Sequence, residues 1–274
     1  MSTSHLLRHL HLPSITPFTH AQTLQSLLVS QFLTHKAALS SSPPSPLPPA
    51  PLPTILTFSP TPVYTTGRRE LGTLTASQTA LLRAPLPNSG AYPIAEVTET
   101  LRGGQTTFHG PGQLVIYPIL DLKSVRSATW PRGLTARCFV NLLEQTTIDV
   151  LGGFGVKGIR TENPGVWIDD LKKVAALGVH LRRNVTSYGV GLNVCTDLRW
   201  FDRIVACGLE GKKTTSLREE GVKEGLELGE VARLWVQRFV EGLWGEEGKV
   251  VEIKEEDITG KGAGELLPKD RRTL

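Results

Sequence analysis

Between Tyr92 and Val194 the chain alternates short apolar segments of strand length with one segment of helical length. AEVTET alternates apolar and polar residues, QLVIYPI is apolar at nearly every position, and GVWIDD, KKVAALGVHL and SYGVGLNV follow one another at hairpin spacing. CFVNLLEQTTIDVL, which lies between them, has helical length. We therefore expect a mixed α/β fold of the α+β type, in which mixed sheets are surrounded by helices.

Further elements are predicted on both sides of this region. LLRHLHLP is typical of a strand, and TPFTHAQTLQSLLVSQFLTHKAAL predicts a helix capped by Thr16 or Thr19. TILTFS is typical of a strand, whereas TPVYTTGRRE predicts a turn in which Gly67 offers a flexible backbone position. Ser216 and Glu219 form a capping box in SLREE, ahead of a helix with an apolar face made by Leu228, Val231, Trp235, Phe239 and Leu243.

These segments fit one domain. Residues 1–39 supply its first strand and helix, residues 54–250 the rest of it, and residues 251–274 a polar tail. Residues 40–53, SSSPPSPLPPAPLP, form an extended surface loop because proline lacks an N–H donor and fixes φ. This loop is interpreted as an insertion between elements, although its PxxP spacing is also compatible with a ligand for an SH3-type partner.

Composition and charge exclude several classes of protein. The 274 residues are 39% hydrophobic but contain no apolar run of transmembrane length, so we expect no membrane role. The formal net charge of +4 comes from dispersed Lys and Arg, which argues against a nucleic-acid partner and is compatible with an acidic protein partner. Cys138, Cys195 and Cys207 are too widely spaced for a disulfide framework or a zinc site, so we expect a reducing compartment and no metal.

Two other patterns are only weak indications of function. No acidic residue precedes Glu70, a property of mitochondrial targeting segments, but Arg8 is the only early arginine, so a short signal is an alternative to folded structure. GFGVKG matches the glycine pattern of dinucleotide sites, but Pro164 forbids the helix that such a site needs, and the chain has no P-loop motif. We therefore expect no nucleotide cofactor.

Three residues are candidates for a catalytic role from their type and sequence context. Cys207 lies in RIVACGL, where a following glycine suits a loop that presents a thiol beside backbone N–H groups. A thiolate nucleophile needs a nearby cation, and Lys173, which opens an apolar strand, is a candidate for that cation. His109 is the third. Each is also compatible with a structural role, since free cysteines, for example, are often buried in cores.

RGGQTTFHGPGQLVIYP, which begins at Arg102, resembles the signature of the octanoyltransferases of lipoate biosynthesis, the lipoyl(octanoyl) transferase or lipoate-protein ligase B family. KKVAALG, SYGVGLN and ACG follow in that family's order, and TPVYTTGRR resembles an earlier family segment. The resemblance covers residues 54–220. It implies a single catalytic domain with the biotin and lipoate protein ligase fold, which moves an octanoyl chain from acyl carrier protein, through a cysteine thioester, to a lysine of a lipoyl domain.

The resemblance also implies roles for particular residues. Cys207 matches the family's acyl-thioester nucleophile, and Lys173 matches the lysine that lowers the pKa of that thiol. We expect glycines to let the backbone approach the acyl chain and QLVIYP to form the floor of its tunnel. The residues implied in substrate binding are Arg102, Gly103, Gly104, Gln105, Thr106, Thr107, Phe108, His109, Ala176, Leu177, Gly178, Gly189, Val190 and Gly191.

The partners implied are proteins. Octanoyl acyl carrier protein is the expected donor, and the expected acceptors are the lipoyl domains of 2-oxoacid dehydrogenase E2 subunits and the glycine cleavage H protein. No cofactor is implied. The pathway and the acid-poor start of the sequence place the protein in the mitochondrial matrix if it is eukaryotic, and in the cytoplasm otherwise.

Two positions depart from the family's pattern. Tyr188 stands where the HGxALN segment usually has histidine, and Gly191 stands where it usually has alanine. The first change puts activity in doubt if that histidine moves a proton, and the second could enlarge the acyl pocket. Three alternatives stay open: an ATP-dependent lipoate ligase, which would not require a cysteine at position 207, a lipoyl amidotransferase, and an inactive scaffold that binds acyl carrier protein or lipoyl domains.

Overall fold

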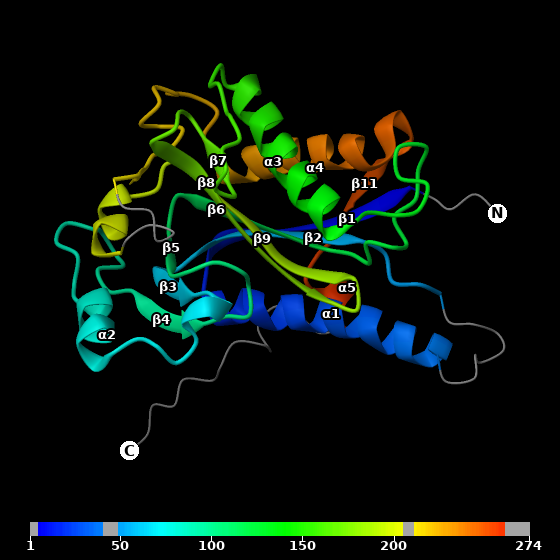
Figure 1. The fold of residues 1–274 in the computed structure, drawn as a ribbon, viewed down its shortest axis with the longest axis horizontal. Coiled ribbons are helices and arrows are strands. Elements are labelled where there is room, and N and C mark those ends of the chain that lie inside the picture. The colour runs from blue at the N-terminus through cyan, green and yellow to red at the C-terminus, as the bar shows by residue number, and fades with distance from the viewer. Residues whose placement is uncertain (1–4, 41–48, 205–210, 261–274) are drawn as a thin grey trace.

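A mixed sheet of eight strands runs through the protein (Figure 1), in a computed structural model that describes residues 5–40, 49–204 and 211–260. The strand order is β10, β8, β9, β6, β2, β1, β11, and β7 pairs with β8. The bounds are β1 Leu6–Thr16, β2 Thr54–Pro60, β6 Gln113–Ile119, β7 Val166–Trp167, β8 Lys172–Arg182, β9 Val185–Asn193, β10 Lys213–Thr214 and β11 Lys249–Glu252. Strands from near both ends of the described chain thus belong to one sheet.

Helices cover both faces of this sheet. α1 (Phe18–Ser40) and α5 (Glu256–Thr259) lie on one face, and α3 (Ala136–Gly153) and α4 (Leu228–Trp244) lie on the other (Figure 1). In β6, Leu114 and Ile116 join the core on the side of α3 and α4, whereas Val115, Tyr117 and Ile119 join the core on the side of α1. Because both faces are buried, β6 is apolar at nearly every position after Gln113 instead of alternating.

A second sheet of three strands holds the end of the glycine-rich stretch. Its order is β4 (Glu96–Glu99), β3 (Val63–Thr66), β5 (Thr107–His109), and α2 (Ala76–Arg83) and the 3₁₀ helix η2 (Leu198–Arg203) pack against it. The ring of Phe108 stacks on that of Trp200 with centroids 5.1 Å apart. The hydroxyl of Tyr64 donates a hydrogen bond to Trp200 O at 2.6 Å. These contacts pack β3 and β5 against η2, which follows β9 of the large sheet closely in sequence.

The mixed α/β prediction is confirmed, and the predicted strands and helices exist with three local corrections. The first concerns TPVYTTGRRE, for which a turn was wrong. Residues Val63–Thr66 form β3, which is buried and pairs with both β4 and β5, and only Arg68–Glu70 forms a 3₁₀ turn, η1. A strand inside a sheet can be as polar as VYTT when its neighbours supply the hydrogen bonds and the burial.

The other two corrections concern helix caps. α1 begins at Phe18, and the Thr16 hydroxyl donates to Ser14 O, while Thr19 lies inside the helix, so neither threonine is the cap. Ser216 accepts the N–H of Glu219, as in a capping box, but it closes a turn, because α4 begins only at Leu228. Gly221 and Gly225, both with positive φ, separate the turn from the helix.

The segments expected to be irregular are described only in part. Within the expected 40–53 loop, residues 41–48 lie outside the described residues, and Pro53 O accepts a hydrogen bond from Arg8 N. The region expected to be a polar tail begins with regular structure, since β11 pairs in parallel with β1 and α5 packs near α1. Residues 261–274 lie outside the described residues. Two 3₁₀ turns complete the elements, η1 and η4 (Gly245–Glu247).

Candidate active site

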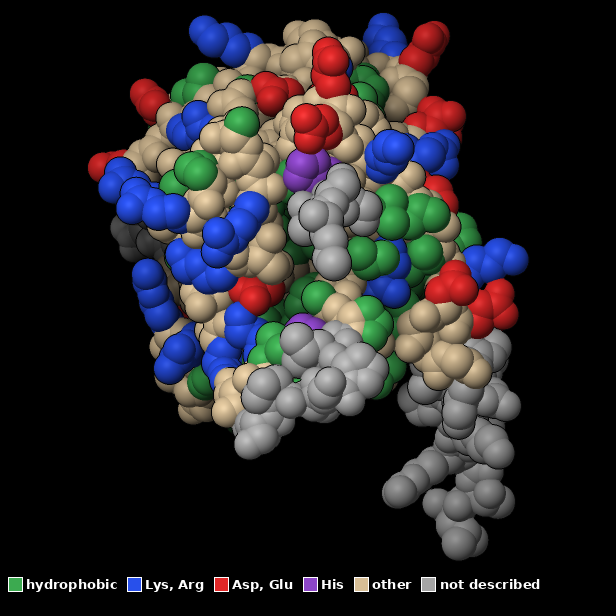
Figure 2. Space-filling view, turned by 90° about the vertical axis from the view of Figure 1, so that its right-hand side faces the viewer, with side chains coloured by type: hydrophobic (Ala, Val, Ile, Leu, Met, Phe, Trp, Pro, Cys, Tyr) green, Lys and Arg blue, Asp and Glu red, His purple; other side chains and the backbone are tan. Residues whose placement is uncertain are grey.

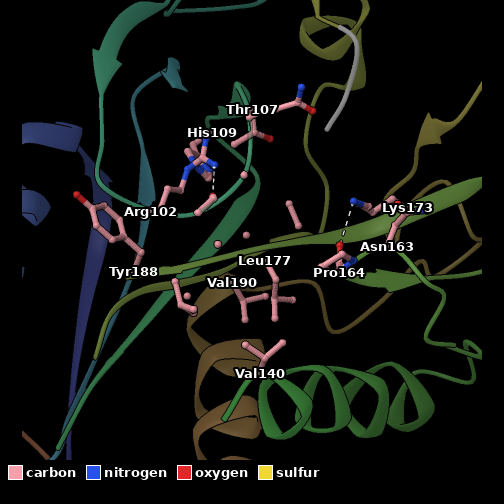
Figure 3. Close-up of a pocket in the computed structure, with 18 of the residues that line it drawn as sticks. Arg102, Thr107, His109, Val140, Asn163, Pro164, Lys173, Leu177, Tyr188 and Val190 are labelled. Carbon is pink, nitrogen blue, oxygen red and sulfur yellow. Dashed lines mark hydrogen bonds between the residues drawn. The ribbon is translucent and has the colours of Figure 1, made fainter. Parts of the chain in front are cut away.

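A cavity of about 580 Å³ opens between the two sheets and α3 (Figure 3). Lys173 and Asn163 lie at one end of it and Tyr188 at the other. The lining combines the glycine-rich stretch, strands β8 and β9, and single residues from α3 and β6: Arg69, Arg102, Gly103, Gly104, Gln105, Thr107, His109, Tyr117, Val140, Asn163, Pro164, Lys173, Ala176, Leu177, Gly178, Val179, Tyr188, Gly189, Val190 and Gly191. Apolar side chains with a few polar groups at defined places are typical of a ligand site.

Arg102 anchors the glycine-rich wall. It is 7% exposed, and its Nη2 donates to Thr65 O at 2.6 Å and to Thr65 Oγ1 at 2.9 Å. The backbone N–H of Gly103 donates to Val179 O at 3.0 Å, so the glycine-rich wall is hydrogen-bonded to β8. Gly67 lies so close that a Cβ there would be 2.0 Å from Gly104 O. Gly67 has a φ of −86°, so the close approach, and not a special backbone conformation, requires glycine.

His109 is held neutral by its surroundings. Its Nδ1 lies 2.6 Å from Gln113 Oε1, and Gln113 Nε2 donates to Asn193 Oδ1 at 2.8 Å, which leaves Oε1 to accept the Nδ1 proton. Burial, together with the positive charge of Arg102, lowers the pKa of His109 to about 4, against a weaker opposing effect of the Gln113 hydrogen bond. At neutral pH its Nε2 can therefore only accept a hydrogen bond.

Lys173 supplies a cation at the end of the cavity opposite Tyr188. The side chain is 7% exposed, and Nζ donates to Pro164 O at 3.2 Å and lies 4.5 Å from the centroid of the Trp167 ring. Strand pairing explains this position, because Trp167 on β7 is the register partner of Lys173 on β8. The carbonyl and the ring face both favour a cation without neutralising it.

The floor is a hairpin of small and apolar residues. β8 and β9 pair in antiparallel register with Ala176 opposite Gly191, Leu177 opposite Val190 and Gly178 opposite Gly189. Gly189 also permits close packing on β6, since a Cβ there would be 2.3 Å from Ile116 O. Val140 of α3 adds a further apolar side chain (Figure 3). An extended apolar chain can lie along such a surface.

Tyr188 closes the end of the cavity opposite Lys173. It has a φ of +59°, which is rare for an aromatic residue, and its side chain is 6% exposed. Its N–H donates to Gln25 Oε1 of α1 at 2.6 Å, and its Oη accepts the N–H of Leu101 at 3.3 Å. Its ring meets that of Tyr117 edge to face, with centroids 5.6 Å apart.

Most of the residues predicted from the sequence meet in this cavity, with two exceptions. Thr106 instead donates its hydroxyl to Glu70 Oε2 at 2.6 Å. Phe108 points into the core of the small sheet, because successive residues of β5 face opposite ways. The strand QLVIYP was expected as the floor, but only Tyr117 of that strand lines the cavity. Cys207 lies outside the described residues.

Sequence reasoning did not identify several lining residues. Four of them come from three separate segments, and only the fold brings them together: Arg69, Val140 and the adjacent Asn163 and Pro164. The alternation along β8 could have indicated Val179, which follows Leu177 on the same strand. In residues 5–40, 49–204 and 211–260, no cluster of three His, Cys, Asp or Glu side chains could hold a metal ion. No helix in these ranges is long and apolar enough to span a membrane.

Known proteins resemble this chain in sequence and in fold. A family model described as the lipoyl protein ligase A/B catalytic domain matches residues 49–240. A Schizosaccharomyces pombe protein named probable octanoyltransferase is 43% identical over 209 residues, 76% of this chain and 83% of that protein. The human mitochondrial octanoyl-[acyl-carrier-protein]:protein N-octanoyltransferase LIPT2 is 45% identical over 162 residues, 58% of this chain and 62% of that protein.

Solved structures share the fold at low sequence identity. Lipoate-protein ligase A bound with ATP superimposes with a TM-score of 0.57 at 13% identity, over 92% of each chain. A bipartite lipoate protein ligase from Thermoplasma acidophilum superimposes with a TM-score of 0.54 at 13% identity, over 92% of this chain and 88% of that one. The family model spans most of the chain and the S. pombe relative is covered over most of its length, so this chain belongs to the lipoyl protein ligase A/B catalytic domain family.

Proposed function

We propose that this protein transfers an octanoyl group from acyl carrier protein to the ε-amine of a lysine on a lipoylated protein, by way of a thioester on Cys207. The observation that carries the proposal is the cavity with Lys173 at one end and an apolar hairpin floor. Its volume of about 580 Å³ is within the usual range for ligand pockets and leaves room for an octanoyl chain. The octanoyltransferase relatives support the same reaction.

The first step exchanges one thioester for another. The thiolate of Cys207 attacks the acyl carbonyl, a carbon–sulfur bond forms, and the carrier leaves as a thiolate that takes up a proton. Because the two thioesters are nearly equal in energy, this step depends on orientation and on donors for the oxyanion more than on driving force. A cation such as Lys173 favours the thiolate form of a neighbouring cysteine.

The second step forms an amide and releases Cys207. The acceptor lysine must attack as a neutral amine, although a free lysine has a pKa of about 10.4, so a base has to remove its proton. Lys173 can serve as that base after acylation, because the departing carrier thiolate takes up the Lys173 proton and the negative charge of the Cys207 thiolate has then gone. As the carbon–nitrogen bond forms, the bond to Cys207 breaks and the thiolate is regenerated.

The described residues on either side of the 205–210 segment support a role for Cys207. Before it, η2 stacks through Trp200 on Phe108 of β5. After it, β10 pairs in parallel with β8, with Lys213 opposite Lys172 and Thr214 opposite Lys173. The described residues that flank the 205–210 segment thus contact the small sheet on one side and the strand of Lys173 on the other.

A basic surface beside the cavity suits an acidic protein partner. Arg68, Arg69, Arg182 and Arg183 are exposed, and none of them forms an ion pair with a carboxylate of the described residues. Partial burial and the charges of Arg68 and Arg182 lower the pKa of His180, which indicates that these two arginines lie near one another. Figure 2 shows Lys and Arg side chains gathered along one side of the face that it draws. Such a surface would attract the acidic carrier protein that brings the acyl group.

The finer assignments follow from this reaction. The acceptors are the lipoyl domains of 2-oxoacid dehydrogenase E2 subunits and the glycine cleavage H protein. The location is the mitochondrial matrix if the protein is eukaryotic, in line with the mitochondrial human relative. The reaction needs no ATP, which separates it from a lipoate ligase, and it uses an acyl carrier as donor, which separates it from a lipoyl amidotransferase.

The test is transfer without ATP. The protein is mixed with octanoyl acyl carrier protein and an unlipoylated lipoyl domain, and intact-mass spectrometry follows the acceptor. An octanoyl increment on the acceptor lysine in the absence of ATP is expected. An increment only with ATP and free octanoate would instead indicate a ligase. Binding of both proteins without any transfer would indicate a scaffold.

A further inference from the structure

Two hollows of the protein meet at Tyr188. One is the cavity of about 580 Å³ described above, and the other is an open groove of about 800 Å³ between α1 and the segment before Arg102. Tyr188 lines both of them. The groove is otherwise lined by Thr19, Gln22, Thr23, Ser26, Leu27, Leu71, Glu99, Thr100 and Leu101. Tyr188 is therefore part of the partition between the two spaces.

The partition is held rigidly. Tyr188 is fixed at its N–H by Gln25 of α1, at its hydroxyl by Leu101 N–H, and at its ring by Tyr117. Pro118 of β6, which has no N–H, lies near this part of β9, where Thr186 Oγ1 donates to Pro118 O at 2.7 Å. The positive φ of Tyr188 is unfavourable for an aromatic residue and persists because these contacts fix it.

We propose that Tyr188 is the stop that sets the greatest length of acyl chain this protein transfers. This inference rests on the proposed octanoyl transfer. With the reacting carbonyl near Lys173, an acyl chain that follows the hairpin floor passes Ala176, Leu177 and Val190. Val179 is the register partner of Tyr188, and six residues of extended strand from Lys173 to Val179 correspond to about 20 Å. The Lys173 side chain occupies part of that length, and a longer acyl chain meets the Tyr188 ring.

The groove behind the ring can receive the end of a longer chain. Leu27, Leu71 and Leu101 line it and are 38%, 38% and 52% exposed, so the groove offers apolar surface to a ligand. If the ring were removed, the apolar floor would continue onto these leucines. Each methylene that leaves water then strengthens binding about fourfold.

The decisive variant is Tyr188→Gly. Glycine adopts a φ near +59° without strain, so the substitution removes the ring and keeps the backbone path. Wild type and variant are given equimolar octanoyl, decanoyl, dodecanoyl and tetradecanoyl acyl carrier proteins in competition, and mass spectrometry records the acyl groups on the acceptor. We expect the wild type to transfer tetradecanoyl much less often than octanoyl, and the variant to transfer tetradecanoyl, relative to octanoyl, at least tenfold more often than the wild type does.

Matched variants separate the effect of removing the Tyr188 ring from the other effects of the substitution. Tyr188→Phe keeps the ring and loses only the hydroxyl contact with Leu101, so it retains the wild-type order of chain lengths. If Tyr188→Gly does not fold, Tyr188→Asn replaces it, because asparagine tolerates positive φ and also opens the partition. A folded Gly or Asn variant with the wild-type order of chain lengths would overturn the proposal.

A binding measurement distinguishes this inference from the proposed function. Calorimetric titration of wild type and Tyr188→Gly with octanoic and tetradecanoic acid reports the length of the cavity without any transfer. A gain in tetradecanoate affinity confined to the variant supports the stop even if no acyl group is transferred. If the wild type transfers octanoyl but both proteins bind tetradecanoate equally well, the proposed function is supported and Tyr188 is excluded as the limit on chain length.

Discussion

Lys173 lies against the face of Trp167, with its Nζ atom 4.5 Å from the ring centroid. The two residues are register partners on β8 and β7, so the contact is built into the large sheet. Pro164 O accepts a hydrogen bond from the same Nζ atom at 3.2 Å. The cation is thus held in one position at the end of the cavity while its charge stays available to a substrate or a thiolate.

Replacing Lys173 by arginine separates its two proposed roles. Arginine keeps the positive charge but does not readily give up a proton. Cys207 of Lys173→Arg should therefore still be acylated, while transfer of the octanoyl group to the acceptor lysine slows by about 10² or more. Single-turnover measurements of each half-reaction across pH test this expectation. Unchanged transfer, with an unchanged pH profile, would exclude Lys173 as the base.

Gly67→Ala should disturb the glycine-rich wall. A Cβ at Gly67 would lie 2.0 Å from Gly104 O, so the wall has to move, and we expect a loss of about 1–3 kcal/mol in the free energy of unfolding together with lower activity. Gly152→Ala in α3 is the matched control, because a Cβ there has no neighbouring atom within 4 Å. Equal effects of both substitutions in denaturant unfolding would contradict this account of the wall.

His109 should make stability fall in acid. Its pKa is lowered to about 4 in the folded protein by burial and by Arg102, whereas an unfolded histidine has a pKa of about 6.5, so the unfolded state binds the proton first. The free energy of unfolding should therefore decrease as the pH falls from 6.5 to 4, by up to about 3 kcal/mol from this residue, and vary little with His109 above pH 6.5. Denaturant unfolding of His109→Gln beside wild type measures this contribution as the difference between their pH slopes. Parallel slopes would show that His109 is not held neutral.

The basic surface should matter only for a donor carried by a protein. The double substitution Arg68→Glu with Arg182→Glu should lower kcat/KM for octanoyl acyl carrier protein about tenfold at low salt, with a smaller effect at high salt. A small octanoyl thioester such as octanoyl-pantetheine should react at the wild-type rate. Lys249→Glu, at the opposite edge of the large sheet, serves as the control. Equal losses with both donors would place these arginines in the reaction instead of in docking.

Candidate residues that share one motif mostly line the same cavity. Lys173, Leu177 and Val190 line one cavity because β8 and β9 are neighbours in sequence and pair directly. Arg102 joins them because the N–H of Gly103 donates a hydrogen bond to Val179 O on β8. Phe108 of the glycine-rich stretch does not line the cavity, because adjacent residues of a strand face opposite ways and, in β5, Thr107 and His109 face it.

Other features depend on contacts that no local pattern contains. Asn163, Pro164 and Val140 reach the cavity from segments that the fold alone brings there. β3 was mistaken for a turn because its polar residues gain hydrogen bonds and burial only from β4 and β5. Tyr188 was recognised as a departure from the family pattern, but its place between two hollows depends on Gln25, Leu101 and Tyr117.

Intact-protein mass spectrometry of the acyl-enzyme tests the central claim most directly. The protein is mixed with octanoyl acyl carrier protein in the absence of ATP and of acceptor, beside Cys207→Ala and the matched variant Cys195→Ala, which removes a free cysteine outside the cavity lining. The thioester account predicts an octanoyl increment on the wild type and on Cys195→Ala, and none on Cys207→Ala. An increment on Cys207→Ala, or no increment on a folded wild type, would contradict it.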